Sequence, residues 1–390
     1  MRTQVGIAGA GPAGLLLSHL LAAEGIDSVV LEIRSRDYVE KRVRAGVLEQ
    51  GTVDLLCASG VGDCLLREGL VHRGLRLRFH GEDHRIPLSD LTGGRAITVY
   101  GQQEIVKDLI RARLEAGGQI LFQAEALGVD DPGGPAPAIR YRHEGEVREL
   151  RCDWVAGCDG SHGVCRDSIP AGALTPFEKE YPFAWLGILA EAPPSTEELI
   201  YSYSDRGFAL HSMRSPRISR LYVQVRPDES LESWPDERIW AELQARFALP
   251  GWSLTEGPVL EKGITRMYSR VFEPMRYGRL FLAGDAAHVV PATGAKGLNL
   301  AVGDVRVLAE ALVDWYRSGR DDLLNAYSDT RLRRVWRAEH FSWWMTSMLH
   351  RFEYDTGFEQ RLQLSQLRYV CSSRAAATSL AENYVGLPET

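Results

Sequence analysis

A glycine-rich turn between two strand-like runs is the feature that most constrains the fold, and it lies within the first 32 residues. An apolar run at Gln4–Ala10 precedes an apolar helical segment at Pro12–Ala23, and the β-branched run Ser28–Glu32 follows. A short strand, a helix and a second strand in this order predict a βαβ unit with parallel strands. We therefore expect an α/β protein whose first domain is Rossmann-like.

Three glycines in this turn, Gly9, Gly11 and Gly14, have the spacing G-x-G-x-x-G. The first permits a tight turn, the second lets backbone N–H groups approach a pyrophosphate, and the third lets the helix pack closely on the strand. Glu32 ends the second strand, where a carboxylate can accept a hydrogen bond from a ribose hydroxyl. These four residues predict a dinucleotide site, and a glycine-rich turn without a ligand is the alternative.

Two later strand-like runs also end in chemically informative residues. Asp153–Cys158 leads into Asp159 and a glycine, and Gly278–Ala283 leads into the sequence G-D-A-A-H that contains Asp285. An aspartate at a strand end can accept hydrogen bonds from the ribityl hydroxyls of a flavin, and Ala286-Ala287 predicts a helix start facing the flavin ring. Each motif alone is compatible with a structural turn, but the three together favour FAD over NAD as the bound cofactor.

The rest of the chain divides into segments with different hydrophobic patterns. Alternating segments such as Arg220–Val225 predict an antiparallel sheet in the middle, and helical spacing prevails from Asn299 onward. We expect an FAD-binding domain, an antiparallel-sheet substrate domain and a C-terminal helical region that serves a dimer interface. The proposed segments are 1–180 for the first part of the FAD-binding domain, 181–270 for the substrate domain, 271–300 for the FAD-binding G-D-A-A-H segment, and 301–390 for the helical region.

Composition bounds the partners and the compartment. The net charge is −7, and a nucleic-acid binder would need a basic field. The basic run Arg331–Arg337 is accordingly interpreted as a solvated face or a subunit contact. No apolar run is long enough for a membrane span and no secretory leader is evident. The six cysteines form no C-x-x-C pair and no metal-ligand pattern, which favours a cytoplasmic protein with free thiols and no metal.

The three motifs in this order resemble those of the single-component FAD-dependent aromatic hydroxylases. The resemblance covers essentially the whole chain and is most specific to members that act on 4-hydroxybenzoate. It implies bound FAD, NADPH or NADH and O2 as co-substrates, a homodimer, and hydroxylation of 4-hydroxybenzoate to 3,4-dihydroxybenzoate through a flavin hydroperoxide. The stretches that carry it are Arg44–Gly51, Thr98–Gln102, Tyr181–Gly187, Phe281–His288, Thr293–Leu300, Phe341–Thr346 and Glu382–Pro388.

The resemblance implies a binding site for the aromatic acid. Ser212, Arg214 and Tyr222 match the clamp for the substrate carboxylate, which suits the planar fork of a guanidinium. Arg220 matches a catalytic residue that holds the flavin near the substrate. Where the family usually has a second proline, this chain has Ala292; its backbone carbonyl is expected to touch the substrate phenol, with a less restricted φ.

The resemblance also implies a proton relay. Tyr201 and Tyr384 match the pair that receives the substrate phenol, and His72 matches the end of the relay toward solvent. A phenol must lose its proton to become electron-rich, and a chain of hydroxyls ending in an imidazole can carry that proton out. Outside the resemblance, a single tyrosine in an alternating strand is more often a core residue.

Further residues match contacts to the two coenzymes. Besides the glycines and carboxylates named above, those for FAD are Arg44, Gln102, Gly297, Leu298 and Asn299. Those for the nicotinamide coenzyme are Arg34, Tyr38, Arg42, His162 and Arg166. Relatives that prefer NADPH usually carry an arginine directly after the glutamate, where this chain has Ile33, so the preference for NADPH or NADH stays open.

Two alternatives to this interpretation are open. A flavin hydroxylase for another small aromatic acid, such as 3-hydroxybenzoate, would share the carboxylate clamp, because the clamp alone does not place the hydroxyl. A non-catalytic flavin-fold binding protein, similar to the prenyl-protein escort proteins, would be expected to lack Glu32 or Asp285, and both are present. The sequence shows no second G-x-G-x-x-G after a strand, so we expect the nicotinamide coenzyme to bind without its own Rossmann domain.

Overall fold

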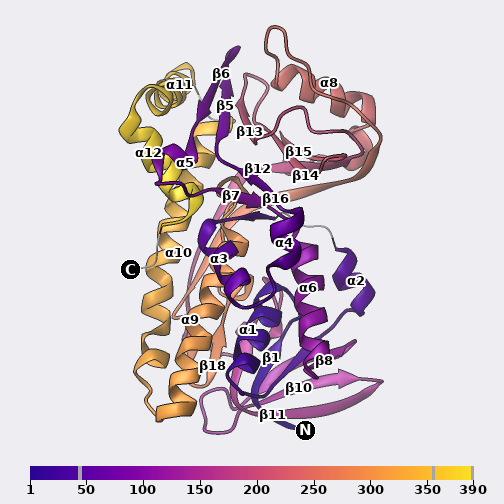
Figure 1. Ribbon diagram of the computed structural model, residues 1–390, viewed down its shortest axis with the longest axis vertical. Coiled ribbons are helices and arrows are strands. Elements are labelled where there is room, and N and C mark those ends of the chain that lie inside the picture. The colour runs from indigo at the N-terminus through magenta and orange to yellow at the C-terminus, as the bar shows by residue number, and fades with distance from the viewer. Residues whose placement is uncertain (43–45, 354–355, 388–390) are drawn as a thin grey trace.

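Figure 1 shows the computed structural model of the chain, which describes residues 1–42, 46–353 and 356–387. An α/β part holds the N-terminus at one end of the long axis, and a mostly antiparallel sheet lies at the other end. Two long helices, α9 (Gly297–Ser318) and α10 (Asp322–Leu349), run along one side of the α/β part. The expected α/β fold with an antiparallel sheet and C-terminal helices is confirmed.

The predicted βαβ unit is present at the N-terminus. β1 (Arg2–Ala8) and β2 (Ser28–Glu32) are parallel neighbours, and α1 (Pro12–Ala23) connects them. Pro12 stands in the first turn of α1, where an N–H group has no intrahelical acceptor. Gly25 follows the helix end with a φ of 72°, a conformation that favours glycine. The local signals in this segment therefore set the bounds of the helix and of the second strand.

The first sheet is assembled from segments far apart in the chain. Among the described residues its strand order is β17-β18-β11-β1-β2-β8, with β10 and β9 continuing from β11. β11 is parallel to both β1 and β18, and Ala8, Gly157 and Leu282 align across the three strands. The three sequence motifs therefore follow strand ends at one edge of the sheet. The later strands are β8 (Gln119–Phe122), β9 (Glu125–Asp130), β10 (Ala138–His143), β11 (Glu146–Gly157), β17 (Arg276–Tyr277) and β18 (Leu280–Leu282).

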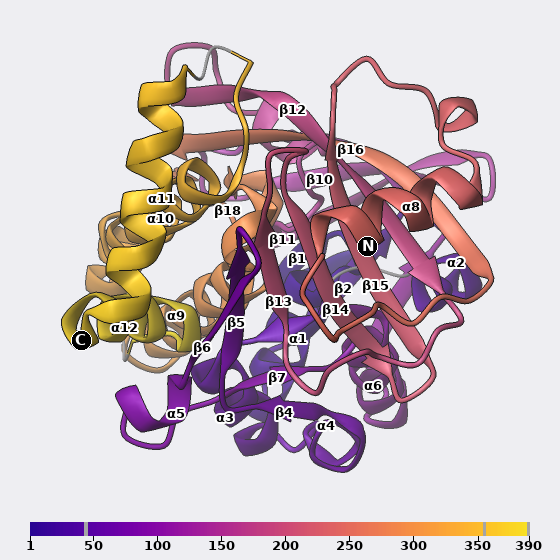
Figure 2. The ribbon, with the colours of Figure 1, turned by 90° about the horizontal axis from the view of Figure 1, so that it is seen from above.

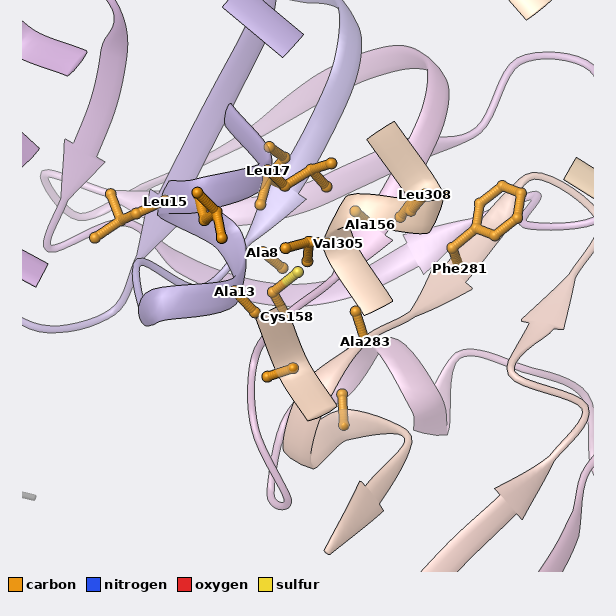
Figure 3. Packing of buried hydrophobic residues seen from close by; sticks show 14 of the residues in the cluster. Ala8, Ala13, Leu15, Leu17, Ala156, Cys158, Phe281, Ala283, Val305 and Leu308 are labelled. Atoms are coloured by element: carbon orange, nitrogen blue, oxygen red, sulfur yellow. The ribbon is translucent and has the colours of Figure 1, made fainter. Parts of the chain in front are cut away.

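Apolar side chains from these distant segments share one core. Figure 3 shows Ala8 of β1, Leu15 of α1, Ala156 of β11, Phe281 of β18 and Val305 of α9 in this cluster, and all five are buried. Burial of apolar surface is the main favourable term in folding. The shared core therefore holds the strand ends that carry the three motifs in a fixed arrangement.

The second sheet has the order β19-β16-β12-β15-β14-β13-β5-β6 among the described residues, and its neighbours are antiparallel except for β13 and β5. Figure 2 shows α8 (Asp236–Arg246) crossing the outer side of β14 and β15. Leu221 and Val223 of β15 pack in one cluster with Ile239 and Leu243 of α8. The opposite face of β15 is therefore free to carry functional side chains. The bounds are β5 (Leu75–Phe79), β6 (Glu82–Ile86), β12 (Thr175–Ala190), β13 (Ile200–Tyr203), β14 (Ala209–Ser215), β15 (Ile218–Val225), β16 (Val259–Glu273) and β19 (His288–Val289).

A small sheet and several short helices complete the described chain. The small sheet has the order β3-β7-β4, with β3 (Val47–Leu48), β4 (Leu70–His72) and β7 (Ile97–Val99). The remaining α-helices are α2 (Arg36–Lys41), α3 (Gln50–Ala58), α4 (Asp63–Glu68), α5 (Leu88–Leu91), α6 (Gln102–Glu115), α7 (Val164–Asp167), α11 (Gly357–Ser372) and α12 (Arg374–Val385). Single 3-10 turns are η1 (Leu231–Ser233), η2 (Gly284–Ala286) and η3 (Ala292–Gly294). No helix of the described chain is both long and apolar enough to cross a membrane.

One local expectation is wrong, and a second holds only in part. Ala286-Ala287 does not start a helix, because the chain makes the single 3-10 turn η2 and then pairs as β19 with β16. The helix start expected here lies instead at Gly297, after η3. The basic run is not a uniformly solvated face either, since Arg331 is 1% exposed and donates to Asp304 of α9.

The proposed segment boundaries remain a prediction. The strand pairing adds one fact to them, because β5 and β6, which lie within the first segment, belong to the second sheet through β13. The chain therefore enters the second sheet before the middle segment begins.

Candidate active site

The glycines of the first turn differ in their surroundings. A Cβ on Gly9 would lie 2.4 Å from the Cys158 carbonyl oxygen, and one on Gly14 would lie 2.0 Å from the Gly9 carbonyl oxygen. A side chain at either position would collide with the backbone unless the backbone shifts, and Gly9 also has a φ of 98°. A Cβ on Gly11 would meet nothing within 4 Å. Gly11 therefore borders open space at the N-terminus of α1, where backbone N–H groups and the helix dipole favour a pyrophosphate.

Glu32 is held at the end of β2 by two backbone donors. Its carboxylate oxygens accept hydrogen bonds from Ala10 N and Arg34 N, both at 2.8 Å. Each oxygen has a second lone pair, so a fixed carboxylate at this strand end can still accept a ribose hydroxyl. The geometry fits the predicted role of Glu32.

Asp159 also has a structural function at the end of β11. Its Oδ2 accepts a hydrogen bond from Cys165 N at 2.9 Å, which fastens the start of α7. Burial raises the pKa of Asp159, and backbone donors oppose that rise. Its Oδ1 is buried without a hydrogen-bond partner among the described residues, so one acceptor at this strand end is left for a ligand hydroxyl.

Asp285 lies partly buried on η2, and a buried ionic cluster holds this turn in place. Asp304 Oδ2 accepts from Gly284 N at 2.9 Å and bonds His288 Nε2 at 2.6 Å, while its Oδ1 accepts from Arg331 Nε at 2.8 Å. Burial raises the pKa of Asp304, but His288 and Arg331 outweigh it and bring the pKa to about 2. Sequence reasoning missed this cluster, for which the only signal was an aspartate within an apolar helical segment.

The start of α9 offers backbone donors. The first N–H groups of an α-helix have no intrahelical acceptor, and Gly297, Leu298 and Asn299 occupy these positions. The Asn299 side chain is committed elsewhere, since its Oδ1 accepts from Glu49 N and Thr52 Oγ1, both at 2.8 Å. The three residues can therefore contact a flavin through their backbone, in agreement with the dipole argument.

A buried lysine connects this helix start to the C-terminal helix. Lys296 Nζ donates to Glu49 Oε1 at 2.5 Å and to the Tyr384 carbonyl oxygen at 3.1 Å. Burial lowers the pKa of Lys296, and the neighbouring Glu49 opposes that change. Sequence reasoning did not single out this lysine. Of the remaining predicted FAD contacts, Gln102 is the partly buried first residue of α6, and Arg44 lies outside the described residues.

The predicted substrate residues share one face of the second sheet. Directly paired residues and residues two apart lie on the same face. Tyr201 pairs with Leu210, Leu210 with Tyr222, and Ser212 with Arg220. A Cβ on Gly187 of β12 would lie 3.0 Å from the Arg220 guanidinium, so this glycine makes room for the arginine. Arg220 Nε lies 3.3 Å from the Tyr222 hydroxyl, to which it donates.

Arg214 is prepared to receive an acceptor. Its NH1 group donates to Ser212 Oγ at 3.1 Å and to the Met213 carbonyl oxygen at 2.8 Å. Its Nε is buried and has no acceptor among the described residues. Burial lowers the pKa of Arg214, while Tyr222 acts to raise it. A carboxylate would supply the missing acceptor and compensate the buried charge.

The two predicted relay tyrosines are in direct contact. The hydroxyls of Tyr201 and Tyr384 are 2.6 Å apart, although the residues lie on β13 and α12. Each side chain is 1% exposed, and burial raises the pKa of both phenols. The Tyr201 hydroxyl also donates to the Thr293 carbonyl oxygen at 3.2 Å. A proton can therefore move between the two hydroxyls without reaching water.

The other two residues predicted near the phenol are placed differently. His72 is buried on β4, no hydrogen bond of the described chain joins it to the tyrosines, and burial lowers its pKa to about 4. Ala292 is exposed, and its carbonyl oxygen accepts from Ala295 N at 3.0 Å. The carbonyl that meets Tyr201 is that of Thr293, one residue later.

The predicted nicotinamide residues form two groups. In the first, the guanidinium groups of Arg34 and Arg42 lie 5.2 Å and 5.9 Å from the ring centre of the exposed Tyr38. In the second, His162 is exposed after β11, and Arg166 donates to the Ser161 carbonyl oxygen at 3.0 Å. No hydrogen bond or ion pair among the described residues joins the two groups.

Comparison with known proteins identifies the family of this chain. Residues 2–342 match the family model described as an FAD binding domain. The p-hydroxybenzoate hydroxylase of Acinetobacter baylyi is 49% identical over 389 residues, which cover 100% of this chain and 96% of that protein. The chain belongs to the FAD-binding aromatic hydroxylases. The chain therefore uses FAD as its cofactor, with NAD(P)H and O2 as co-substrates.

More distant relatives of the hydroxylase extend the comparison. A 3-(3-hydroxy-phenyl)propionate/3-hydroxycinnamic acid hydroxylase of Klebsiella pneumoniae is 26% identical over 348 residues, which cover 84% of this chain and 60% of that protein. The crystal structure of a p-nitrophenol 4-monooxygenase from Pseudomonas putida superposes with a TM-score of 0.84 over 99% of both chains at 20% identity. At that identity the likeness supports the fold of the hydroxylase and not its substrate.

Proposed function

We propose that this hydroxylase converts 4-hydroxybenzoate to 3,4-dihydroxybenzoate. One oxygen atom of O2 enters the ring, the other leaves as water, and NAD(P)H supplies the two electrons. The observation that carries the proposal is the buried contact of Tyr201 with Tyr384, because Tyr201 shares its sheet face with Ser212, whose hydroxyl accepts a hydrogen bond from Arg214. A carboxylate site and a phenol site on one face suit a benzoate with its hydroxyl opposite the acid. The 49% identity to a p-hydroxybenzoate hydroxylase supports the same substrate.

The chain's own residues have separable tasks in this reaction. Bound FAD would supply the hydride acceptor and the group that activates O2 for transfer of one oxygen atom. Arg214 binds the carboxylate with Ser212 beside it, which orients the ring. Tyr201 accepts a hydrogen bond from the phenol. As the ring becomes electron-rich, the phenol proton passes to Tyr201, the Tyr201 proton passes to Tyr384, and Tyr384 releases its own proton toward the outer end of the relay. Both tyrosine side chains are buried, so bulk water does not compete for their hydrogen bond to each other.

The outer end of the relay and the coenzyme site are further parts of the proposal. We assign His72 to the outer end of the relay, where its low pKa keeps the imidazole neutral and able to pass a proton without retaining it. The nicotinamide coenzyme is assigned to the two groups led by Arg34 and Arg166. Arg36 is paired with Glu40 at 2.6 Å, so Arg34 is the better placed of the two to meet a 2′-phosphate.

The test is oxidation of NADH and of NADPH by the FAD-loaded protein, each with and without 4-hydroxybenzoate, with the aromatic product quantified. We expect the acid to accelerate coenzyme oxidation and 3,4-dihydroxybenzoate to form in near-equal amount. A parallel assay with 3-hydroxybenzoate separates the two substrate readings. Turnover of that acid, with none of 4-hydroxybenzoate, would overturn the substrate assignment, and the two coenzyme rates decide the NADPH or NADH preference.

We also propose that the hydroxylase forms a homodimer through an aromatic face of α10. Phe177 of β12 and Trp336 and Trp343 of α10 are 43%, 41% and 41% exposed. They line a groove of about 280 Å³ between β12, β16 and α10. Light scattering of the purified protein should give twice the mass of the chain, and Trp343→Lys should reduce it to one copy. A monomeric wild-type protein would refute the dimer.

A further inference from the structure

The proton of Tyr201 has a defined resting acceptor. Each tyrosine hydroxyl carries one proton, and the Tyr201 hydroxyl lies within reach of both Tyr384 and the Thr293 carbonyl oxygen. The carbonyl can only accept. The arrangement that satisfies all three groups has Tyr384 donating to Tyr201 and Tyr201 donating to Thr293. The position of this carbonyl therefore influences where the relay proton rests.

A hydrogen bond from α10 holds the Thr293 residue. Thr346 Oγ1 donates to Thr293 Oγ1 at 2.8 Å, and both residues are fully buried. The packing here is close, since a Cβ on Gly294 would lie 2.4 Å from Ser342 Oγ, one turn earlier on α10. Ser342 Oγ itself has no partner among the described residues. Thr346 thus supplies the side-chain hydrogen bond that fastens η3 to α10 beside the tyrosines.

Thr346 is in turn held by a buried histidine. The Thr346 carbonyl oxygen accepts from His350 Nδ1 at 3.0 Å, and His350 Nε2 accepts from Trp185 Nε1 at 2.7 Å. These two bonds select the tautomer with its proton on Nδ1. The His350 ring stacks on Phe208 with centres 4.3 Å apart. The chain of contacts runs from β12 through α10 and η3 to Tyr201.

We propose that Thr346 is a positioning residue for the proton relay, because it fixes the Thr293 carbonyl that accepts the Tyr201 proton. This inference rests on the proposed function, in which Tyr201 meets the substrate phenol. When the bound phenol is neutral, Tyr201 keeps its bond to Thr293. When the phenol is ionised, the Tyr201 proton must leave the carbonyl and turn to the phenolate. A well-placed carbonyl therefore favours the neutral phenol.

Other groups near the pair constrain the test. Tyr222 acts to raise the pKa of Tyr201. Lys296 places its Nζ 5.6 Å from the centre of the Tyr384 ring. His350 stays neutral, because burial lowers its pKa to about 3. Substitution of Thr346 leaves these groups in place, so a change in phenol ionisation can be assigned to the carbonyl.

The experiment titrates 4-hydroxybenzoate bound to the FAD-loaded enzyme between about pH 6 and 10, following phenolate absorbance without NAD(P)H. For Thr346→Val, which keeps the side-chain shape, the midpoint should fall by about half to one pH unit, the value of one neutral hydrogen bond. Thr293→Val removes the same bond from the other side and should shift the midpoint likewise. Thr346→Ser retains the hydroxyl and should restore the wild-type midpoint.

Ser342→Ala is the matched control, because it removes a buried hydroxyl beside the same turn without removing a hydrogen bond. An unchanged midpoint in Thr346→Val, or an equal shift in Ser342→Ala, would overturn the inference. A wild-type enzyme that binds no ionisable 4-hydroxybenzoate would refute the proposed substrate instead. In that case a crystal structure of Thr346→Val decides, since a Tyr201–Thr293 distance still near 3.2 Å contradicts the positioning role.

Discussion

Gly11 and Gly14, at the two ends of the first turn of α1, should respond differently to the same added methyl group. One substitution should lower the stability of the apoprotein, and the other should lower the affinity for FAD. In Gly14→Ala the Cβ would lie 2.0 Å from a backbone oxygen, which cannot move away as a flexible side chain could. Overpacking of this kind costs about 1–3 kcal/mol of unfolding free energy. In Gly11→Ala the Cβ meets nothing within 4 Å, and the backbone φ of −75° suits alanine. The loss of a glycine N-cap should therefore cost the apoprotein no more than about 1 kcal/mol.

The order of effects reverses when FAD is added. The space beside Gly11 is where we place the pyrophosphate, so a methyl group there should remove at least one charge-assisted hydrogen bond. Such a bond contributes about 1.5–3 kcal/mol, which corresponds to a loss of FAD affinity of about 10- to 100-fold. Apoprotein melting should show a decrease of roughly 1–4 °C for Gly14→Ala and within about 1 °C for Gly11→Ala. Titration of flavin fluorescence should show the weaker binding in Gly11→Ala.

Either of two results would refute this reasoning. If Gly11→Ala apoprotein melts as low as Gly14→Ala, the space beside Gly11 is not open in the folded protein. If Gly11→Ala binds FAD as tightly as the wild type, the pyrophosphate does not approach that position. Matched measurements on both variants therefore separate packing from ligand contact.

Three further predictions concern the substrate site and acid stability. Tyr201→Phe should keep coenzyme oxidation but reduce product formation by about 10²–10⁴-fold, whereas Tyr203→Phe, on the same strand, should hydroxylate normally; equal product yields would refute the relay. Arg214→Gln should raise the KM for the acid by about 10- to 100-fold, and Arg217→Gln, at an exposed position, should leave it unchanged. Equal KM values for the two variants would refute the role of Arg214 in binding the carboxylate. Because the pKa of Asp304 is about 2, below its unfolded value, its stabilisation should be complete above about pH 4 and disappear toward pH 2. Asp304→Asn should lose about 3–5 kcal/mol at neutral pH and show a flatter acid limb in urea unfolding, and wild-type acid sensitivity would contradict the assignment.

The parts of the fold that were predictable depend on local chemistry. α1 and β2 have the bounds that the hydrophobic pattern indicated, because both are buried and end at a strong local signal. The helix expected at Ala286-Ala287 failed for a reason no local pattern contains. Asp304 fixes the preceding turn, and the chain then finds a partner in β16, which is distant in the sequence. Pairing with a distant strand therefore outweighed the local helix propensity of this segment.

The site residues likewise divide into those that could be predicted from the sequence and those that could not. Tyr201 and Tyr384 were predicted from family resemblance, and their contact joins positions that no spacing rule connects. Thr346 lies in a stretch that carried the resemblance, yet a threonine in a helix gives no sign that it bonds across to η3. Arg331 was interpreted as part of a basic surface run because its partner on α9 is visible only after the helices pack.

The acidic net charge of the chain does not conflict with the proposed anionic substrate, for a physical reason. The chain carries −7 in total, but charges on its surface are screened over about 8–10 Å at physiological ionic strength. A carboxylate in the site is instead surrounded by nearby groups in a medium of lower effective dielectric, where interactions are several times stronger than in water. Arg214 has a buried Nε with no acceptor among the described residues, and Arg220 pairs directly with Ser212 on the sheet face that also carries Tyr222. Two guanidinium groups at this range outweigh a distant acidic surface, so an acidic enzyme can bind an anionic substrate.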